Sequence, residues 1–129
     1  MQPYVWIAIG SALGGIARYW CTLRAAQLFG ETFPWGTLFI NILGSFIIGL
    51  FVALTAPEGR YIVDQNFRLF VTVGFCGGFT TFSAFSLQTM VLMQEGQWLP
   101  AGAYILASVL VCLFAVWLGY FLAMQLNAL

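Results

Sequence analysis

Histidine and lysine are absent from the sequence, and charged side chains of any kind make up only 6% of its 129 residues, against 62% hydrophobic ones. Soluble globular domains carry about a quarter charged residues, so this composition excludes a soluble domain. It predicts an all-α integral membrane protein and gives no reason to expect an enzyme. The formal net charge is zero, and nothing in it points to nucleic acid as a partner.

Cysteines are few and odd in number, and Cys21, Cys76 and Cys112 all fall within long apolar stretches. An odd set of cysteines inside helices is not typical of a disulfide framework, and small apolar packing is the ordinary role of such residues. A metal cluster built on side chains is excluded as well, because the chain has neither histidine nor a Cys-x-x-Cys spacing.

Carboxylates are missing from every long apolar stretch. The acidic residues all fall in predicted loops and are Glu31, Glu58, Asp64 and Glu95. Proton-coupled transporters and cation exporters usually bind their coupling ion with an aspartate or glutamate inside the membrane. Small multidrug resistance exporters have chains of similar size and depend on a glutamate in the first helix, where this chain has Arg18. The absence disfavours a proton-coupled exporter, which stays as an alternative.

Long hydrophobic runs, by contrast, dominate the chain. About 20 apolar residues are needed to cross a bilayer as a helix, and suitable stretches occur at residues 4–28, 35–56, 67–94 and 99–126. The first has no basic start and no clear cleavage site, so we expect it to remain in the mature protein. Short polar loops are predicted around residues 24–34, 57–66 and 95–100. The pattern predicts one transmembrane domain of four helices over residues 1–129.

Arg18 lies about 14 residues into the first stretch. An unpaired guanidinium at such a depth would cost several kcal/mol, so it must reach water or a partner. Two interpretations stay open. The side chain snorkels toward the loop at the end of the helix, or it is a cation that concentrates anions at the mouth of a pore.

Polar side chains recur at every fourth position in two of the stretches and therefore lie along one face of each helix. They are Thr37, Asn41 and Ser45 in the second stretch and Tyr104, Ser108 and Cys112 in the fourth. Hydrogen bonds between packed membrane helices would explain such faces, and so would a narrow polar path. In the first stretch, Gly10 and Gly14 form a surface that lets another helix approach closely.

The segment GFCGGFTTFSAFS, residues 74–86, departs from the apolar pattern of the third stretch. We expect Gly77 and Gly78 to break the helix at mid-membrane, which is tolerated only where protein or water satisfies the freed carbonyls and amides. Carbonyls turned inward can coordinate a hard monovalent cation without any acidic residue.

Aromatic rings and hydroxyls follow the glycine pair. Phe79, Phe82 and Phe85 are spaced three apart and are expected on roughly one face, where core or lipid contact is their ordinary role. The positive edge of a ring can also attract an anion. Hydroxyls that can donate hydrogen bonds to the same anion belong to Thr80, Thr81, Ser83 and Ser86. With the polar faces of the second and fourth stretches they would form a donor-rich path that favours a small anion.

The sequence resembles the Fluc fluoride channels, also called CrcB proteins, over nearly the whole chain. The similar segments are GGIARYW at 14–20, WGTLFINILGSFIIG at 35–49 and GFCGGFTTFSAFS at 74–86. The resemblance implies a channel that exports fluoride passively across the bacterial inner membrane and lowers fluoride toxicity. It also implies a dual-topology homodimer, in which two antiparallel copies in the lipid bilayer form two pores along their interface.

The same resemblance implies roles for particular residues. The fluoride pore would be lined by Asn41, Thr81, Phe82, Ser83, Phe85, Tyr104 and Ser108. A structural sodium ion (Na+) at the dimer centre would be held by the backbone carbonyls of Gly77 and Thr80, and Arg18 would lie in the aqueous vestibule.

The chain departs from the family pattern at two places. Cys112 and Val116 stand in the fourth stretch where hydroxyls are common, which leaves open whether the far end of that polar track lines a pore. Ala84 stands where a threonine is common, between the two family phenylalanines, and we expect this change to alter packing more than permeation.

The arginines bear on orientation without any reference to the family. With both termini on one side of the membrane, Arg60 and Arg68 lie on that side, and Arg24, with Arg18, lies on the other. Since orientation follows the arginine bias in membrane proteins with short loops, both orientations are expected to insert. Two functions other than a channel remain as alternatives: the proton-coupled exporter and a non-conducting assembly subunit.

Overall fold

The computed structural model describes residues 2–129, and every regular element in that range is helical. The elements are α1 (Gln2–Phe29), α2 (Trp35–Leu54), α3 (Gln65–Leu69), the π-helix η1 (Phe70–Cys76), α4 (Gly77–Phe79), α5 (Phe82–Gln94) and α6 (Trp98–Ala128). The prediction of an all-α chain is confirmed. The start predicted for the first loop is wrong, because α1 continues through Arg24 to Phe29 over residues that favour helix.

Three helical segments are long and apolar enough to cross a membrane: Trp35–Leu54, Gln65–Gln94 and Trp98–Ala128. α1 has sufficient length, with 28 residues, but it is not among them. Of the four predicted spans, three therefore meet the criterion of length and composition. A chain with several such helices is a multi-pass membrane protein.

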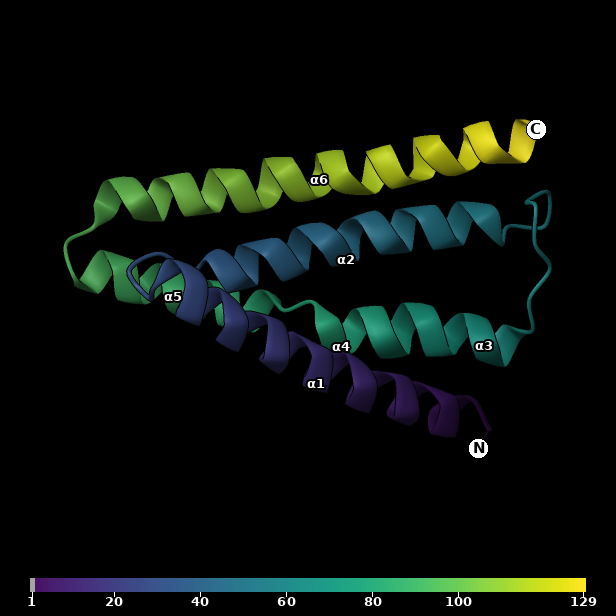
Figure 1. The fold of residues 1–129 in the computed structure, drawn as a ribbon, viewed down its shortest axis with the longest axis horizontal. Coiled ribbons are helices and arrows are strands. Elements are labelled where there is room, and N and C mark those ends of the chain that lie inside the picture. The colour runs from purple at the N-terminus through teal and green to yellow at the C-terminus, as the bar shows by residue number, and fades with distance from the viewer. Residues whose placement is uncertain (1) are drawn as a thin grey trace.

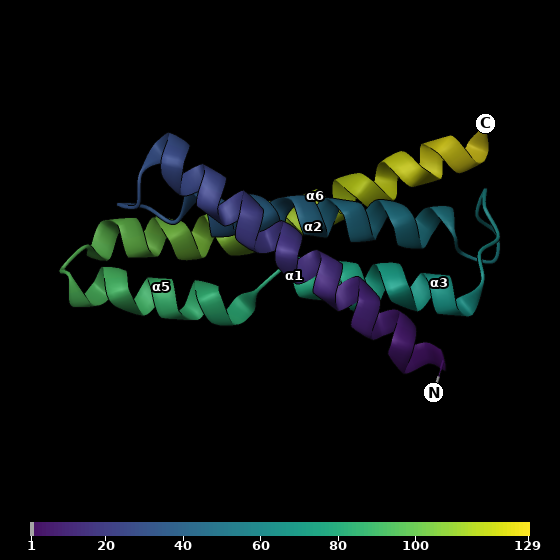
Figure 2. The same cartoon turned by 60° about the horizontal axis from the view of Figure 1, so that its bottom comes forward.

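The long helices run along the long axis of the molecule (Figure 1). α6 packs against α2, and α1 crosses the segment formed by η1 and α4 at an angle, as Figure 2 shows from a second direction. Both termini lie at the end where α2 is connected to α3, and the α1–α2 and α5–α6 connections lie at the opposite end (Figure 1). The chain therefore passes along the bundle an even number of times.

Two seams between helices depend on glycine. A Cβ atom on Gly14 of α1 would overlap the carbonyl oxygen of Phe75, and Gly10 contacts the same segment as closely. Between α6 and α2, a Cβ atom on Gly119 would overlap the carbonyl oxygen of Phe46. The close approach predicted for Gly10 and Gly14 is confirmed, and backbone contact of this kind is what holds helices together in lipid.

The third segment is interrupted at Thr80 and Thr81 instead of at the glycine pair. Gly77 and Gly78 are helical, whereas Thr80 (φ −90°, ψ 160°) and Thr81 (φ −153°, ψ 122°) are extended. The predicted position of the break is therefore wrong. Threonine hydroxyls offer the backbone an alternative to helical bonds, and here Thr81 Oγ1 accepts a hydrogen bond from the Ala84 N–H at 3.1 Å and caps α5. Gly78 serves packing, since a Cβ atom there would meet the backbone of α1.

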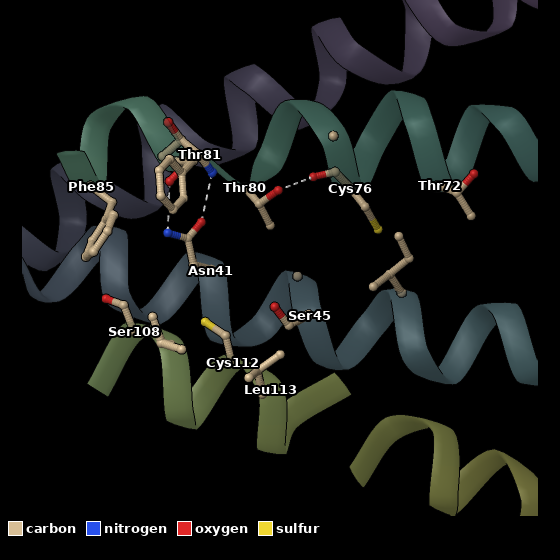
Figure 3. Close-up of a pocket in the computed structure, with 15 residues that line it drawn as sticks. Asn41, Ser45, Thr72, Cys76, Thr80, Thr81, Phe85, Ser108, Cys112 and Leu113 are labelled. Atoms are coloured by element: carbon tan, nitrogen blue, oxygen red, sulfur yellow. Dashed lines mark hydrogen bonds between the residues drawn. The ribbon is translucent and has the colours of Figure 1, made fainter. Parts of the chain in front are cut away.

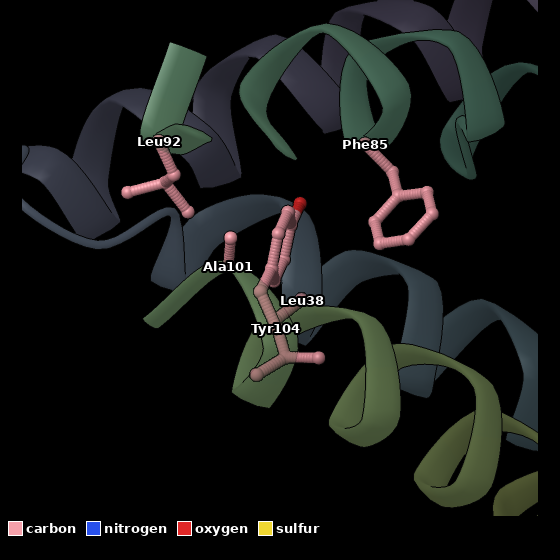
Figure 4. Packing of buried hydrophobic residues seen from close by; sticks show 5 residues of the cluster. All are labelled: Leu38, Phe85, Leu92, Ala101 and Tyr104. Carbon is pink, nitrogen blue, oxygen red and sulfur yellow. The ribbon is translucent and has the colours of Figure 1, made fainter. Parts of the chain in front are cut away.

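A small apolar core holds the end of the bundle at which α5 is connected to α6 (Figure 4). Its buried members come from α2, α5 and α6 and are Leu38, Phe85, Leu92, Ala101 and Tyr104. The loop positions predicted for the acidic residues are confirmed for Glu31, Glu58, Asp64 and Glu95. All three cysteines are free. Side-chain packing thus anchors α5 at its far end, while its start lies beside the Thr80–Thr81 break.

Candidate functional site

The Thr80–Thr81 break is held by the side-chain amide of Asn41 on α2. The Oδ1 atom of Asn41 accepts a hydrogen bond from the Thr81 N–H at 2.8 Å, and its Nδ2 atom donates one to the Thr81 carbonyl at 3.0 Å (Figure 3). These bonds replace backbone hydrogen bonds that an extended residue in a helix loses. Because an amide nitrogen carries two N–H groups, Asn41 keeps one donor beyond this pair.

The break also frees carbonyl groups at the end of α4. The Thr80 N–H still donates to the Cys76 carbonyl at 3.0 Å, and the Thr80 hydroxyl donates to the same oxygen at 2.8 Å. The Gly78 carbonyl accepts a hydrogen bond from Arg18 Nε at 3.1 Å. Within residues 2–129, no hydrogen bond reaches the carbonyls of Gly77 or Thr80 across the break. These oxygens are hard ligands and are left for another partner, as is the carbonyl of Phe79, to which no hydrogen bond across the break is made within the same residues.

An open cavity of about 460 Å³ lies between α2, the third segment and α6 (Figure 3). The predicted pore and cation-site residues that line it are Asn41, Gly77, Thr80, Thr81, Phe82, Phe85 and Ser108. The rest of its lining consists of Gly44, Ser45, Ile48, Thr72, Cys76, Val109, Cys112 and Leu113. None of these lining residues has a charged side chain, so polar contacts in the cavity come from hydroxyl, thiol, amide and backbone groups.

Two aromatic rings stand at the start of α5. The ring centres of Phe82 and Phe85 are 5.3 Å apart, and the planes are tilted by 55°. Phe82 is 76% exposed and Phe85 only 8%, so the pair extends from the core to the open side of the cavity. Phe79 is stacked on Phe75 at 5.6 Å, outside the cavity lining. The prediction of three phenylalanines on one face is wrong, because the break ends the helical register before Phe82.

Ser108 brings an unpaired hydroxyl to the cavity. Its Oγ atom is buried and has no hydrogen-bond partner within residues 2–129. A buried polar atom without a partner costs about 1–3 kcal/mol, so this oxygen is available to a hydrogen-bonding partner in the cavity. Cys112 lines the same cavity, whereas Val116 does not and packs against Gly49 instead. The polar lining contributed by α6 therefore includes Cys112 and stops short of Val116.

Three of the predicted site residues lie outside the cavity lining. Tyr104 is fully buried, and its hydroxyl donates a hydrogen bond to Gln88 Oε1 at 2.7 Å. Ser83 is exposed, with its hydroxyl oxygen 3.3 Å from that of Thr81. Arg18 contacts the break from the side of α1. Tyr104 and Ser83 contact residues that line the cavity, Phe85 and Thr81 respectively. Arg18 is separated from the cavity by α4.

The polar face of α2 is divided between two cavities. Asn41 and Ser45 line the first, and Thr37 lines a second cavity of about 340 Å³ beside the α1–α2 loop. Gln88 also lines the second cavity and is the hydrogen-bond partner of Tyr104, yet nothing in the sequence patterns singles it out. The available signal was an amide side chain inside a long apolar stretch, where a polar group needs a partner.

The fold and the cavity together define a class of protein: a small multi-pass helical membrane protein with an uncharged polar cavity beside an interrupted helix. The chain belongs to the CrcB family, since the family model described as "CrcB-like protein, Camphor Resistance (CrcB)" matches residues 5–120. The resemblance observed in the sequence is thereby confirmed.

Several similar proteins share the name fluoride-specific ion channel FluC. The protein from Methylocella silvestris is 56% identical over 126 residues, which cover 98% of this chain and 96% of that protein. The protein from Opitutus terrae is 54% identical over 129 residues, covering 100% of this chain and 98% of its own length. The protein from Paramagnetospirillum magneticum is 52% identical over 127 residues, with 98% and 99% covered.

Proposed function

We propose that this protein is a fluoride-selective channel through which the ion leaves the cytoplasm passively. The observation that carries the proposal is the cavity, where the unpaired Ser108 hydroxyl, the remaining Asn41 N–H and the rings of Phe82 and Phe85 border a space without charged side chains. Relatives named for fluoride channels match the chain over nearly its full length, which supports the same function.

Selectivity follows from the chemistry of the donors. Fluoride is small and strongly hydrated, so a pore must replace its water with hydrogen-bond donors and positive ring edges. Chloride is larger and a weaker acceptor, and it would fit such a route poorly. We assign the route to Asn41, Thr81, Phe82, Ser83, Phe85, Tyr104 and Ser108. Tyr104 continues it one helical turn from Ser108, where the phenol is paired with Gln88.

The working unit in this proposal is an antiparallel homodimer with two pores. The cavity is open on one side, where Phe82 is 76% exposed, and a second copy covering this side would complete the walls. The free carbonyls of Gly77 and Thr80 fit a structural sodium ion, a hard cation that oxygen ligands bind without an acidic residue. A second copy would contribute the same pair of oxygens, because a two-fold axis repeats every contact.

A passive pore suits export from a bacterial cell. Hydrogen fluoride crosses membranes as a neutral molecule and ionises inside, so fluoride accumulates in the cytoplasm. A channel in the inner membrane would lower this concentration without an energy source. The helices of residues 2–129 contain no carboxylate to bind a coupling proton, which supports channel behaviour over coupled export.

The test is ion efflux from liposomes that contain the purified full-length protein. Vesicles loaded with potassium fluoride or potassium chloride are given a potassium ionophore, and each anion is followed with a selective electrode. We expect fast fluoride efflux and chloride efflux at the level of empty vesicles. Equal efflux of the two anions would contradict the proposed selectivity.

Two other results would favour the alternative functions. Uphill fluoride uptake driven by a pH gradient would indicate a proton-coupled exporter. Silent vesicles that contain folded dimer would indicate a non-conducting assembly subunit.

A further inference from the structure

Arg18 is hydrogen-bonded to the interrupted third segment. Its side chain is half-buried, and Nε donates a hydrogen bond to the Gly78 carbonyl at 3.1 Å. In an unbroken helix this carbonyl would accept from the N–H four residues later, that of Phe82. The break removes that donor, because Phe82 begins a new helix. The guanidinium therefore replaces a backbone donor that the break has removed.

Glycine packing places Arg18 beside this carbonyl. A Cβ atom on Gly78 would lie 2.5 Å from the carbonyl oxygen of Ser11 and 3.2 Å from the nitrogen of Gly15. α4 thus rests directly on the backbone of α1, with no side chain between the two helices. Arg18, one turn beyond Gly14 and Gly15, reaches the end of α4 from this contact. A cation at the carbonyl end of a helical segment is also favoured by the dipoles of the peptide groups.

The hydrogen bond from Arg18 to the Gly78 carbonyl removes one of the freed carbonyls from the set that could bind a cation. Successive carbonyls in a helix are rotated by about 100° around its axis. The Gly77 carbonyl therefore leaves the helix on a different side from the Gly78 carbonyl, which bonds Arg18 of α1, and Gly77 is exposed and lines the cavity. The carbonyls of Gly77 and Thr80 are left without a hydrogen bond across the break within residues 2–129. The Gly77 and Thr80 oxygens proposed to hold sodium are among those that Arg18 does not take.

We propose that Arg18 is a positioning residue that caps the Gly78 carbonyl, holds the Thr80–Thr81 break open and so presents the Gly77 and Thr80 carbonyls to the cation. The part that concerns the cation rests on the proposed function, whereas the capping of the break does not. This role differs from a vestibule charge in one measurable respect. Attraction of anions by an exposed charge weakens as salt screens it, but a direct, partly buried hydrogen bond depends on salt much less.

The first test is hydrogen–deuterium exchange of the Thr81 amide, measured on the full-length protein in lipid nanodiscs. Arg18→Met removes the donor and keeps the apolar stem. We expect about tenfold or faster exchange at Thr81, the factor that corresponds to loss of a hydrogen bond to a charged group, at both about 0.05 M and about 0.5 M salt. Arg24→Met is the matched control, since Arg24 on the same helix bonds the exposed Gln27 and lies over the ring of Trp20, and it should leave the exchange unchanged.

A second variant keeps the test valid if Arg18→Met fails to fold. Arg18→Lys retains the charge but replaces the planar Nε–H donor, so we expect severalfold faster exchange at Thr81 while anion attraction is kept. Wild-type exchange in the variants that fold, with only a salt-dependent loss of fluoride efflux, would overturn the proposal and favour a vestibule charge.

The cation is tested separately by thermal unfolding in sodium chloride and in N-methylglucamine chloride. We expect sodium to raise the Tm of the wild type and to raise that of Arg18→Met much less. If sodium does not stabilise even the wild type, the proposed sodium site is wrong, and the exchange at Thr81 still decides whether Arg18 caps the break. If sodium stabilises Arg18→Met as much as the wild type, Arg18 does not position the carbonyls.

Discussion

The two halves of the interrupted third segment are held in different ways. The half before the break, residues 65–79, lies with its backbone on the backbone of α1, where Gly10, Gly14 and Gly78 leave no room for a side chain. The half after it, α5, is held by side chains: the Asn41 amide at its start and the apolar core around Phe85 further along. α5 also leaves much apolar surface uncovered.

The difference indicates that the half packed on α1 supports the fold, whereas α5 takes part in binding. Two helices whose backbones are in direct contact have little room to shift, because a small displacement brings their atoms into overlap. A helix held by a few polar bonds and one core cluster can accept a ligand or a second chain on its open side. The cavity lies beside the break and is lined from both halves of the third segment, and the exposed Phe82 at the start of α5 and the unpaired Ser108 hydroxyl of α6 both border it. Five changes, ordered from the largest expected effect to the smallest, test this comparison.

Gly14→Val should have the largest effect, because it adds branched carbon where a Cβ atom alone overlaps the Phe75 carbonyl. We expect destabilisation by at least about 3 kcal/mol and little folded protein, measured by thermal unfolding and size-exclusion chromatography. Gly15→Ala is the control, since a Cβ atom at Gly15 meets nothing within 4 Å, and it should change stability by less than about 0.5 kcal/mol. Normal folding of Gly14→Val would show that the seam on α1 is not rigid.

Forcing all chains to insert in the same orientation should abolish conduction if an antiparallel copy has to cover the open side of α5 to complete the pore. The triple variant Glu58→Lys, Ile62→Lys, Gln65→Lys adds positive charge at the end that carries the termini, so a single orientation should insert. We expect no fluoride efflux from this variant alone. Efflux should return when it is co-expressed with an oppositely biased chain that carries Glu31→Lys and Glu95→Lys. Normal efflux from the triple variant alone would refute the antiparallel dimer.

Asn41→Asp should lower conduction sharply. The carboxylate still accepts from the Thr81 N–H, but it loses the N–H that donates to the Thr81 carbonyl and places a charge in the cavity. We expect the dimer to survive, because one of the two bonds to Thr81 and the core around Phe85 remain. A like charge near contact distance costs a few kcal/mol even in a medium of effective dielectric constant about 20, so fluoride efflux should fall at least about 100-fold. Asn66→Asp at the surface, where the amide bonds Gln2, should leave efflux unchanged. An unaffected rate for Asn41→Asp would remove Asn41 from the route.

Phe85→Ile, and likewise Phe82→Ile, keeps an apolar side chain but removes the positive ring edge. An aromatic interaction is worth about 0.5–1.5 kcal/mol beyond its buried area, so we expect fluoride efflux to fall about tenfold while the dimer persists. Phe114→Ile on α6, where the ring is 57% exposed, is the control and should conduct normally. If the variants at the start of α5 also conduct normally, those rings have only a packing role.

Cys112→Val should have the smallest effect, because it removes a weak donor at the end of the α6 lining. We expect fluoride efflux to fall about threefold and to be restored in Cys112→Ser. Val116→Thr, which lies outside the lining, should leave the rate unchanged. A gain in efflux from Val116→Thr would show that the polar route extends further along α6 than the cavity does.

Much of this architecture was predictable because it depends on patterns local to the chain. Composition and length are sufficient for an all-helical membrane protein, and the loop positions of the acidic residues follow from hydropathy alone. The spacing of Gly10 and Gly14 places both on one face of α1, which predicts the close contact that η1 makes there. A path shared by Asn41, Phe85 and Ser108 was one of two interpretations of the polar and aromatic patterns, and the family resemblance favoured it, since no periodicity links three different helices.

What the sequence by itself determined is therefore the class of protein, the long helices and the polar faces they carry. The tertiary structure decided where the third segment breaks, that Arg18 binds Gly78 and that Gln88 pairs with Tyr104. The glycine pair weakens the helix over the whole region around residues 77–81. The helix is interrupted where a side chain of another helix makes hydrogen bonds that replace the backbone bonds of the helix. Asn41, 40 residues away along the chain, makes these hydrogen bonds with Thr81, and only the packing of α2 against the third segment places that amide there.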